Sequence, residues 1–257
     1  MACYEIRKLT FTYPGETAPA LREVTLTVAD GEFLVLCGAS GSGKSTLLRQ
    51  LKSVLAPHGA RSGEIIFGGV PLEEVTRGEQ AGAIGFVLQD PENQVVTDKV
   101  WHELAFGLES LGYETPVIRR RVAEMAAFFG IQDWFYKNVS ELSGGQKQLL
   151  SLASVMAMQP RVLLLDEPTN HLDWKYQQQI FALIREWLKT PGRAVLSVVH
   201  DLSLARAFGT RALLLDGGRV AAQGAMETVF APETLARVYG MDVYGWMRDL
   251  LGQWSGA

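Results

Sequence analysis

One glycine-rich stretch sets the frame for the whole sequence: Gly38-Ala39-Ser40-Gly41-Ser42-Gly43-Lys44-Ser45. It fits the pattern G-x-x-x-x-G-K-[S/T] of a phosphate-binding loop. The apolar run Phe33–Cys37 before it is typical of a buried strand, and Thr46–Leu51 after it have the pattern of a helix. Glycines let successive backbone N–H groups point inward, and the start of a helix adds partial positive charge. We therefore predict a strand, loop and helix that bind the phosphates of a nucleotide, with Lys44 reaching the β- and γ-phosphates and Ser45 facing Mg²⁺.

The composition is that of an ordinary globular protein. The 257 residues can bury a full-sized core, 47% of them are hydrophobic, and the net charge of -4 gives no basic field for nucleic acid. Cys3 and Cys37 are too few for a disulfide framework, which fits a reducing compartment. We find neither an apolar run of about 18 residues nor a signal-peptide core at the N-terminus, so we expect any role at a membrane to come through a partner.

The first 36 residues alternate apolar and polar side chains in short pieces. Turn signals at Pro14-Gly15 and Asp30-Gly31 separate these pieces, which predicts a small antiparallel sheet beside the loop. Tyr13 lies just before the first turn. Its ring is either a strand residue that covers the core or a platform that stacks on adenine.

A helical pattern fills the middle of the chain. The predicted strand Ile84–Leu88 ends on Gln89, and a polar loop follows it, where we place an internal boundary. Thr115-Pro116 predicts an N-cap and a first-turn proline, and Gly130 predicts the end of that helix. The basic run Arg119-Arg120-Arg121 is most simply a solvated face, with a binding role as the alternative.

A second glycine-rich helix start follows at Ser143-Gly144-Gly145-Gln146, where Ser143 is the expected N-cap. A helix start of this kind suits an anion just as the first one does.

Two strands are predicted to end at one edge of the main sheet with polar side chains. Val162–Leu165 lead into Asp166 and Glu167, and Ala194–Val199 lead into His200. Strand alternation sends Asp166 and Glu167 to opposite sides, so we expect separate roles: Asp166 for Mg²⁺, and Glu167 for a water molecule. A plain strand end is the alternative.

Together these motifs resemble the nucleotide-binding subunits of ABC transporters, from Tyr13 to about Gly224. The most specific piece is Leu142-Ser143-Gly144-Gly145-Gln146. The resemblance implies an α/β P-loop NTPase core, mainly a parallel sheet flanked by helices, with an N-terminal antiparallel β subdomain and an inserted helical subdomain at about 90–160. We predict one ABC ATPase domain over 1–230 and a helical tail over 231–257.

The resemblance also implies roles for individual residues. Tyr13 stacks on adenine, and the residues from Gly38 to Thr46 hold the phosphates of ATP. Glu167 is the general base, His200 contacts the γ-phosphate, and Gln89 senses Mg²⁺ and the attacking water. Ser143 to Gln146 bind the ATP held by a second ABC ATPase subunit, identical or a paralogue, and Asp173 lies at that interface.

The kind of transporter is less sharply indicated. Val87–Gln94 and Glu103–Leu108 look like the ATPases of energy-coupling factor importers of vitamins and cobalt or nickel ions, and in that family this region docks on integral-membrane components. Asn170-His171-Leu172-Asp173 and Pro232–Val243 look more like ATPases of siderophore, haem and cobalamin importers. We favour the first, since the coupling segment is where the partner is chosen, and expect a peripheral location at the cytoplasmic face of the cell membrane. A soluble ABC ATPase without a transport role is a weaker alternative, and a metabolite kinase is weaker still.

Overall fold

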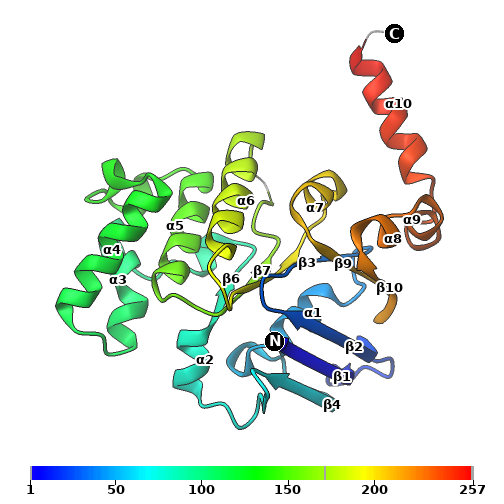
Figure 1. Cartoon of the computed structure of the whole chain (residues 1–257), viewed down its shortest axis with the longest axis horizontal. Coiled ribbons are helices and arrows are strands. Elements are labelled where there is room, and N and C mark those ends of the chain that lie inside the picture. Colours follow the sequence, from blue (N-terminus) through cyan, green and yellow to red (C-terminus); the bar gives the residue numbers. More distant parts are fainter. Residues whose placement is uncertain (1, 171, 256–257) are drawn as a thin grey trace.

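The computed structural model describes residues 2–170 and 172–255, and it arranges them as two sheets with helices around them (Figure 1). His171 and the terminal residues of the predicted domain and tail, Met1, Gly256 and Ala257, lie outside the described residues.

The first sheet is antiparallel and has the order β2-β1-β4-β5. Its strands are β1 (Ala2–Thr12), β2 (Leu21–Ala29), β4 (Ala60–Phe67) and β5 (Val70–Pro71). In β2, Leu21, Val24, Leu26 and Val28 are buried, and between Val24 and Val28 they alternate with exposed residues. One face of this sheet is therefore packed and the other is solvated, as its sequence pattern predicts.

The second sheet has six strands in the order β10-β9-β3-β8-β7-β6, and only the β9–β10 pair is antiparallel. The strands are β3 (Phe33–Cys37), β6 (Ile84–Val87), β7 (Val162–Asp166), β8 (Ala194–Val198), β9 (Arg211–Asp216) and β10 (Arg219–Ala225). The central strands are almost entirely apolar because both of their faces are covered, and their polar residues are Ser197 in β8 and Asp166 at the end of β7. The predicted α/β class with a mainly parallel sheet is confirmed.

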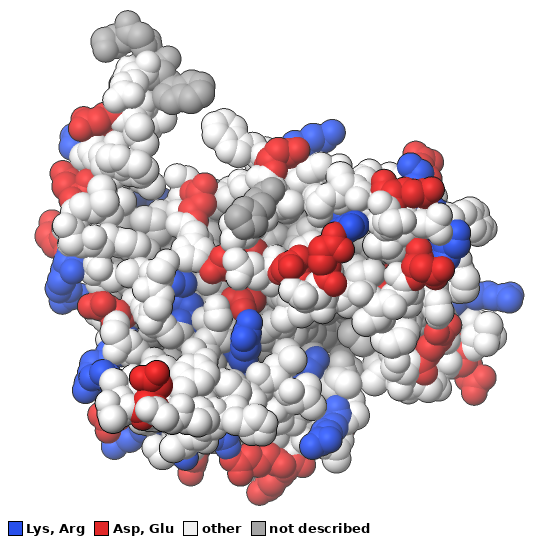
Figure 2. Space-filling view, turned by 180° about the vertical axis from the view of Figure 1, so that it is seen from behind, with Lys and Arg blue, Asp and Glu red and all other residues white. Residues whose placement is uncertain are grey.

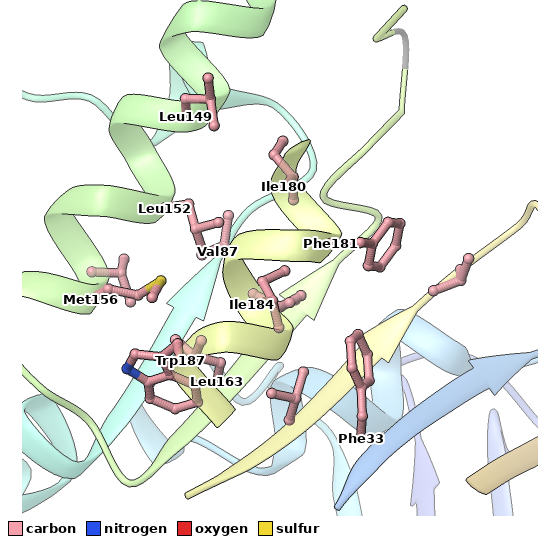
Figure 3. Packing of buried hydrophobic residues seen from close by; sticks show 14 of the residues in the cluster. Phe33, Val87, Leu149, Leu152, Met156, Leu163, Ile180, Phe181, Ile184 and Trp187 are labelled. Atoms are coloured by element: carbon pink, nitrogen blue, oxygen red, sulfur yellow. The ribbon is translucent and has the colours of Figure 1, made fainter. Parts of the chain in front are cut away.

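Each central strand divides its side chains between two hydrophobic clusters. In β3, Phe33, Val35 and Cys37 join one cluster, and Leu34 and Leu36 join the other. The first cluster includes Ile180, Phe181, Ile184 and Trp187, which lie on one face of α6 (Trp174–Leu188) and pack over the sheet (Figure 3). The second cluster joins the other face of this sheet to the antiparallel sheet.

Helices connect the strands and cover the sheets. The α-helices up to β7 are α1 (Lys44–Gln50), α2 (Arg77–Ala83), α3 (Val100–Ser110), α4 (Thr115–Phe129) and α5 (Gly144–Ala157). Short 3₁₀ helices are η1 (Ser53–Leu55), η2 (Pro91–Asn93), η3 (Gln132–Trp134) and η4 (Val139–Glu141). Of these helices, α3, α4 and α5 follow β6, pack on one another and precede β7. The limits of a separate helical subdomain stay a prediction.

One predicted helix start was wrong by a residue. The N-cap of α4 is Glu114, and Thr115 is already the first helical residue, with Pro116 behind it. Glu114 has the extended backbone angles that an N-cap residue typically adopts. The helix ends as predicted at Gly130, with φ +66°.

The C-terminal part adds α7 (Leu202–Phe208), α8 (Met226–Val229), α9 (Pro232–Tyr239) and α10 (Val243–Ser255). The last helix extends away from the body, where Trp246 and Leu251 are exposed (Figures 1 and 2). Over the face seen in Figure 2, basic and acidic side chains are interspersed. None of the described helices combines the length and the apolar character needed to cross a bilayer.

The buried thiol of Cys3 makes the stability of the fold depend on pH. Burial raises its pKa from 9.0 to about 11, so above pH 9 the unfolded chain loses this proton first, and stability falls as pH rises. We expect the free energy of unfolding of the unmodified chain to fall by about 1 kcal/mol more between pH 8 and pH 10 than that of Cys3→Ala. Urea unfolding across this range measures the difference, and parallel curves would contradict it.

Candidate functional site

The glycine-rich loop joins β3 to α1 in a space that admits little besides glycine. Gly38 has φ +137°, and a Cβ atom there would lie 2.2 Å from the carbonyl oxygen of Leu215. Gly43 has φ +100°, and a Cβ atom there would lie 2.7 Å from the carbonyl oxygen of Ala20. Residues with a side chain rarely adopt these backbone angles, and their Cβ atoms would also collide with backbone atoms. Glycine at these two positions therefore defines the course of the loop.

Lys44 turns back onto this loop. Its Nζ donates hydrogen bonds to the carbonyl oxygens of Gly38 and Ala39, both at 2.9 Å, and the residue is only 5% exposed. Burial lowers the pKa of Lys44, and the nearby Glu167, Cys37 and Asp166 act in the opposite direction. The ammonium group is thus held by neutral carbonyls, which a phosphate can replace.

Ser45 and Asp166 form the part of the site that suits a divalent cation. Ser45 Oγ donates to Asp166 Oδ1 at 2.7 Å, and Arg49 Nη2 lies 3.6 Å from Asp166 Oδ2. Burial raises the pKa of Asp166, while the Ser45 hydrogen bond and the Arg49 charge lower it. A hydroxyl and a carboxylate are hard oxygen donors, and Mg²⁺ commonly combines one or two carboxylates with water and phosphate oxygens, so this pair fits Mg²⁺.

Arg49 was missed by the sequence reasoning. It lies four residues after Ser45 in α1, on the same face of the helix. This spacing was the signal that could have found it.

Glu167 lies just beyond the end of β7, in a left-handed backbone conformation with φ +53°. Its Oε1 is 2.5 Å from His200 Nε2, and its Oε2 accepts a hydrogen bond from Asn170 Nδ2 at 3.0 Å. Asp166 and Glu167 do have separate partners, but the reason given from strand alternation was wrong. A turn of the backbone at Glu167, which a non-glycine residue rarely adopts, separates the two carboxylates.

An open cleft of about 410 Å³ brings together about half of the predicted site residues. Its lining includes Tyr13, Ala20, Ser40, Gly41, Gly43, Lys44, Ser45, Thr46, Glu167 and His200. The Tyr13 hydroxyl lies 2.9 Å from Thr46 Oγ1, and its ring packs edge-on against Phe11. The ring therefore has a fixed position at the rim of the cleft, with 36% of Tyr13 exposed.

Other predicted residues lie elsewhere. Gln89 is exposed after β6, and in the described part of the chain it makes no hydrogen bond to Ser45 or Asp166. The lining of the cleft includes neither the start of α5 nor Asp173. Ser143 caps α5, and its Oγ accepts from Gln146 N at 3.4 Å. Asp173 caps α6 by accepting from Tyr176 N at 3.0 Å. Their functional roles stay predictions.

The start of α5 packs against α6 at Gly145. A Cβ atom there would lie 2.7 Å from Tyr176 Cδ2, whereas at Gly144 nothing lies within 4 Å. We expect the free energy of unfolding of Gly145→Ala to be about 1–3 kcal/mol lower than that of Gly144→Ala. Both substitutions gain the same helix propensity, but only the alanine at position 145 is overpacked. Urea denaturation of the two variants measures this, and equal stabilities would mean that Tyr176 moves aside freely.

Comparison with known proteins adds family information to this geometry. The family described as "ABC transporter" matches residues 21–170. A putative ABC transporter ATP-binding protein of Bacillus anthracis is 42% identical over 227 residues, which are 88% of this chain but 41% of that protein. The chain thus spans about two fifths of the length of this relative.

Three further comparisons each cover most of this chain and most of the other protein. The energy-coupling factor transporter ATP-binding protein EcfA1 of Lactobacillus delbrueckii subsp. bulgaricus is 36% identical over 91% of this chain and 83% of its own. The structure of cbiO1 from Clostridium perfringens, described as part of the ABC transporter complex cbiONQ, has a TM-score of 0.80 and 30% identity over 92% of this chain and 93% of its own. A dimeric ATP-binding cassette in a post-hydrolysis state with ADP and Pi has a TM-score of 0.75 and 27% identity over 87% and 98%.

Proposed function

The chain belongs to the ABC transporter family of ATP-hydrolysing cassettes, and we propose that it binds and hydrolyses ATP in the cleft to drive transport across a membrane. The observation that carries this proposal is the cleft itself. It unites an aromatic ring at Tyr13, a phosphate loop with Lys44, and the Glu167–His200 pair.

The groups that line the cleft support ATP binding. The ring of Tyr13 offers a face for adenine, and the loop offers backbone N–H groups and the start of α1 for the phosphates. Lys44 exchanges its two carbonyl partners for phosphate oxygens. Ser45 and Asp166 would hold Mg²⁺, which neutralises charge on the β- and γ-phosphates.

Hydrolysis then needs a base beside the γ-phosphate. A water oxygen attacks the γ-phosphorus, the bond to the β–γ bridging oxygen breaks, and ADP and phosphate form. Glu167 accepts the proton of that water. In this structure both of its oxygens are bonded, to His200 and to Asn170. Each carboxylate oxygen keeps a second lone pair for the water, so His200 and Asn170 can orient Glu167 while it accepts the proton.

A second ABC ATPase subunit completes the site in this proposal. Ser143 and Gly144 are exposed at the start of a 14-residue helix, which gives them the partial positive charge that favours an anion. Trp174 directly follows Asp173 and is 77% exposed, as expected for an aromatic side chain that a partner covers. A dimer with two ATP molecules at its interface would account for both the exposed helix start and the exposed Trp174.

Replacement of the base gives a direct test. Glu167→Gln keeps the size of the side chain but removes the basic carboxylate. We expect ATP binding to remain, turnover to fall by about 10²- to 10⁴-fold, and an ATP-dependent dimer to accumulate on gel filtration. Glu74→Gln, an exposed carboxylate far along the sequence from the cleft, is the control. Brisk hydrolysis by Glu167→Gln would remove Glu167 from the role of base.

We further propose that the chain serves an energy-coupling factor importer of a vitamin or a transition-metal ion, as a peripheral subunit at the cytoplasmic face of the membrane. The 36% identity to EcfA1 and the likeness to cbiO1 support this type of importer. The alternative remains an importer of siderophores, haem or cobalamin, which the tail sequence favours.

The coupling segment that we propose for the membrane partner contains Asp90 and Glu92. Asp90 shapes the segment itself, since its carboxylate accepts from Glu92 N at 3.0 Å and from Asn93 Nδ2 at 2.9 Å. Glu92 forms an ion pair with Lys147 of α5, yet its side chain is 66% exposed. Glu92 is therefore the carboxylate that can contact a basic partner without loss of the segment's shape.

Co-purification tests the type of importer. Tagged Glu167→Gln chain with ATP is recovered from solubilised membranes of the source organism, and its partners are identified by mass spectrometry. We expect a transmembrane scaffold with a small integral-membrane solute binder. A polytopic permease with an external binding protein would favour the siderophore, haem or cobalamin type instead, and soluble partners alone would contradict a role in transport.

The charge at residue 92 provides the matched variants for the same experiment. We expect Glu92→Lys to lose its membrane partners with unchanged ATP affinity, because the sign of the exposed charge is reversed. Glu92→Lys combined with Lys147→Glu restores the ion pair within the chain but keeps the reversed charge. Recovery of the partners by this double variant would show that the ion pair, rather than docking, is the role of Glu92.

A further inference from the structure

The hydroxyl of Tyr239 contacts the first residue of the phosphate loop. Tyr239 is the last residue of α9, and Gly38 N donates a hydrogen bond to its Oη at 3.1 Å. The two residues are 201 positions apart in the sequence. Tyr239 does not line the cleft, so any influence on a nucleotide passes through the loop.

Gly38 is held on three sides, and Tyr239 supplies one of them. The carbonyl oxygen of Gly38 accepts from Lys44 Nζ at 2.9 Å, and its Cα faces the carbonyl oxygen of Leu215 across a gap too small for a side chain. The N–H group is fixed by the Tyr239 hydroxyl. The residue whose carbonyl oxygen receives Lys44 is therefore held in part by the C-terminal segment.

The tyrosine is itself well anchored. Leu235 and Val238 of α9 are buried in the cluster that also contains Cys37, and Arg237 Nη2 donates to the carbonyl oxygen of Ala221 at 3.2 Å. Burial raises the pKa of Tyr239 to about 12, so its hydroxyl stays neutral. An anchored, neutral hydroxyl is a suitable fixed acceptor for a backbone N–H group.

We propose that Tyr239 is a positioning residue of the nucleotide site, which holds Gly38 so that the loop keeps its phosphate-binding shape before a nucleotide arrives. This inference rests on the proposed function of the cleft. Without the hydroxyl, the loop spends part of its time in other shapes. The apparent affinity for the nucleotide then falls in proportion to the fraction of molecules whose loop still has the binding-competent shape. Once nucleotide is bound, the phosphates themselves hold the loop, so the chemical step is unchanged.

The test compares two tyrosines of the same segment. Tyr239→Phe removes the acceptor of Gly38 N, and Tyr244→Phe removes a hydroxyl that contacts Arg206 Nη1 and Phe230 O, both at 2.8 Å. We expect Tyr239→Phe to raise the Kd for ADP and the KM for ATP about fivefold, the factor that corresponds to one net hydrogen bond, with kcat unchanged. We expect Tyr244→Phe to leave all three values as they are. Calorimetric titration gives Kd, and steady-state hydrolysis gives KM and kcat.

Each other outcome has a distinct meaning. Equal effects of the two variants, or a fall in kcat with KM unchanged, would overturn the proposal in favour of a general loosening of the tail. If the unmodified chain binds no ATP, the proposed function fails; if it binds ATP and Tyr239→Phe binds equally well, only this inference fails. Should Tyr239→Phe not fold, amide hydrogen exchange of the unmodified chain decides: Gly38 is expected to exchange more slowly than Gly41, and equal rates would overturn the proposal.

Discussion

The backbone at Gly38 must turn away from β3 in a space that the carbonyl oxygen of Leu215 already occupies. Only a residue without a Cβ atom fits there, and the turn fixes where the loop carbonyls, and hence the ammonium group of Lys44, come to lie. The course of the loop is thus a consequence of how β3 packs beside β9. The packing of the sheet, rather than a bound ligand, therefore determines the geometry of the cleft.

The order of the strands assembles the rest of the site. In the series β9-β3-β8-β7, the loop follows β3, His200 follows β8, and Asp166 with Glu167 ends β7. Parallel strands finish at one edge of the sheet, so three segments that lie far apart in the sequence meet around one cleft. This edge contains both the Ser45–Asp166 pair that we propose for a cation and the Glu167–His200 pair that we propose for a water molecule.

Local motifs made much of this arrangement predictable. The loop pattern, the N-cap at Ser143 and the apolar strands each depend on neighbouring residues, and the structure has them where the sequence indicates. The left-handed backbone at Glu167 was not predictable, because the preceding residues carry an unbroken strand pattern and non-glycine residues rarely adopt a positive φ. Tyr239 was missed for a different reason. A contact across 201 residues leaves no periodic signal, and the tail pattern indicates only a helix. The role of Gln89 at a cation stays a prediction, because among the described residues it makes no hydrogen bond to Ser45 or Asp166.

The position of β3 also has a consequence for synthesis. Val35 pairs with Ser197 on one side and Ala212 on the other, so the apolar strand Phe33–Cys37 has no β-sheet neighbour until more than 150 further residues have been made. At about 5–20 residues per second, that delay is roughly 8–30 s on the ribosome. Throughout this time both edges of this apolar strand lack their partner strands. A chaperone can protect the nascent chain during this interval, and slower translation lengthens the interval and favours aggregation.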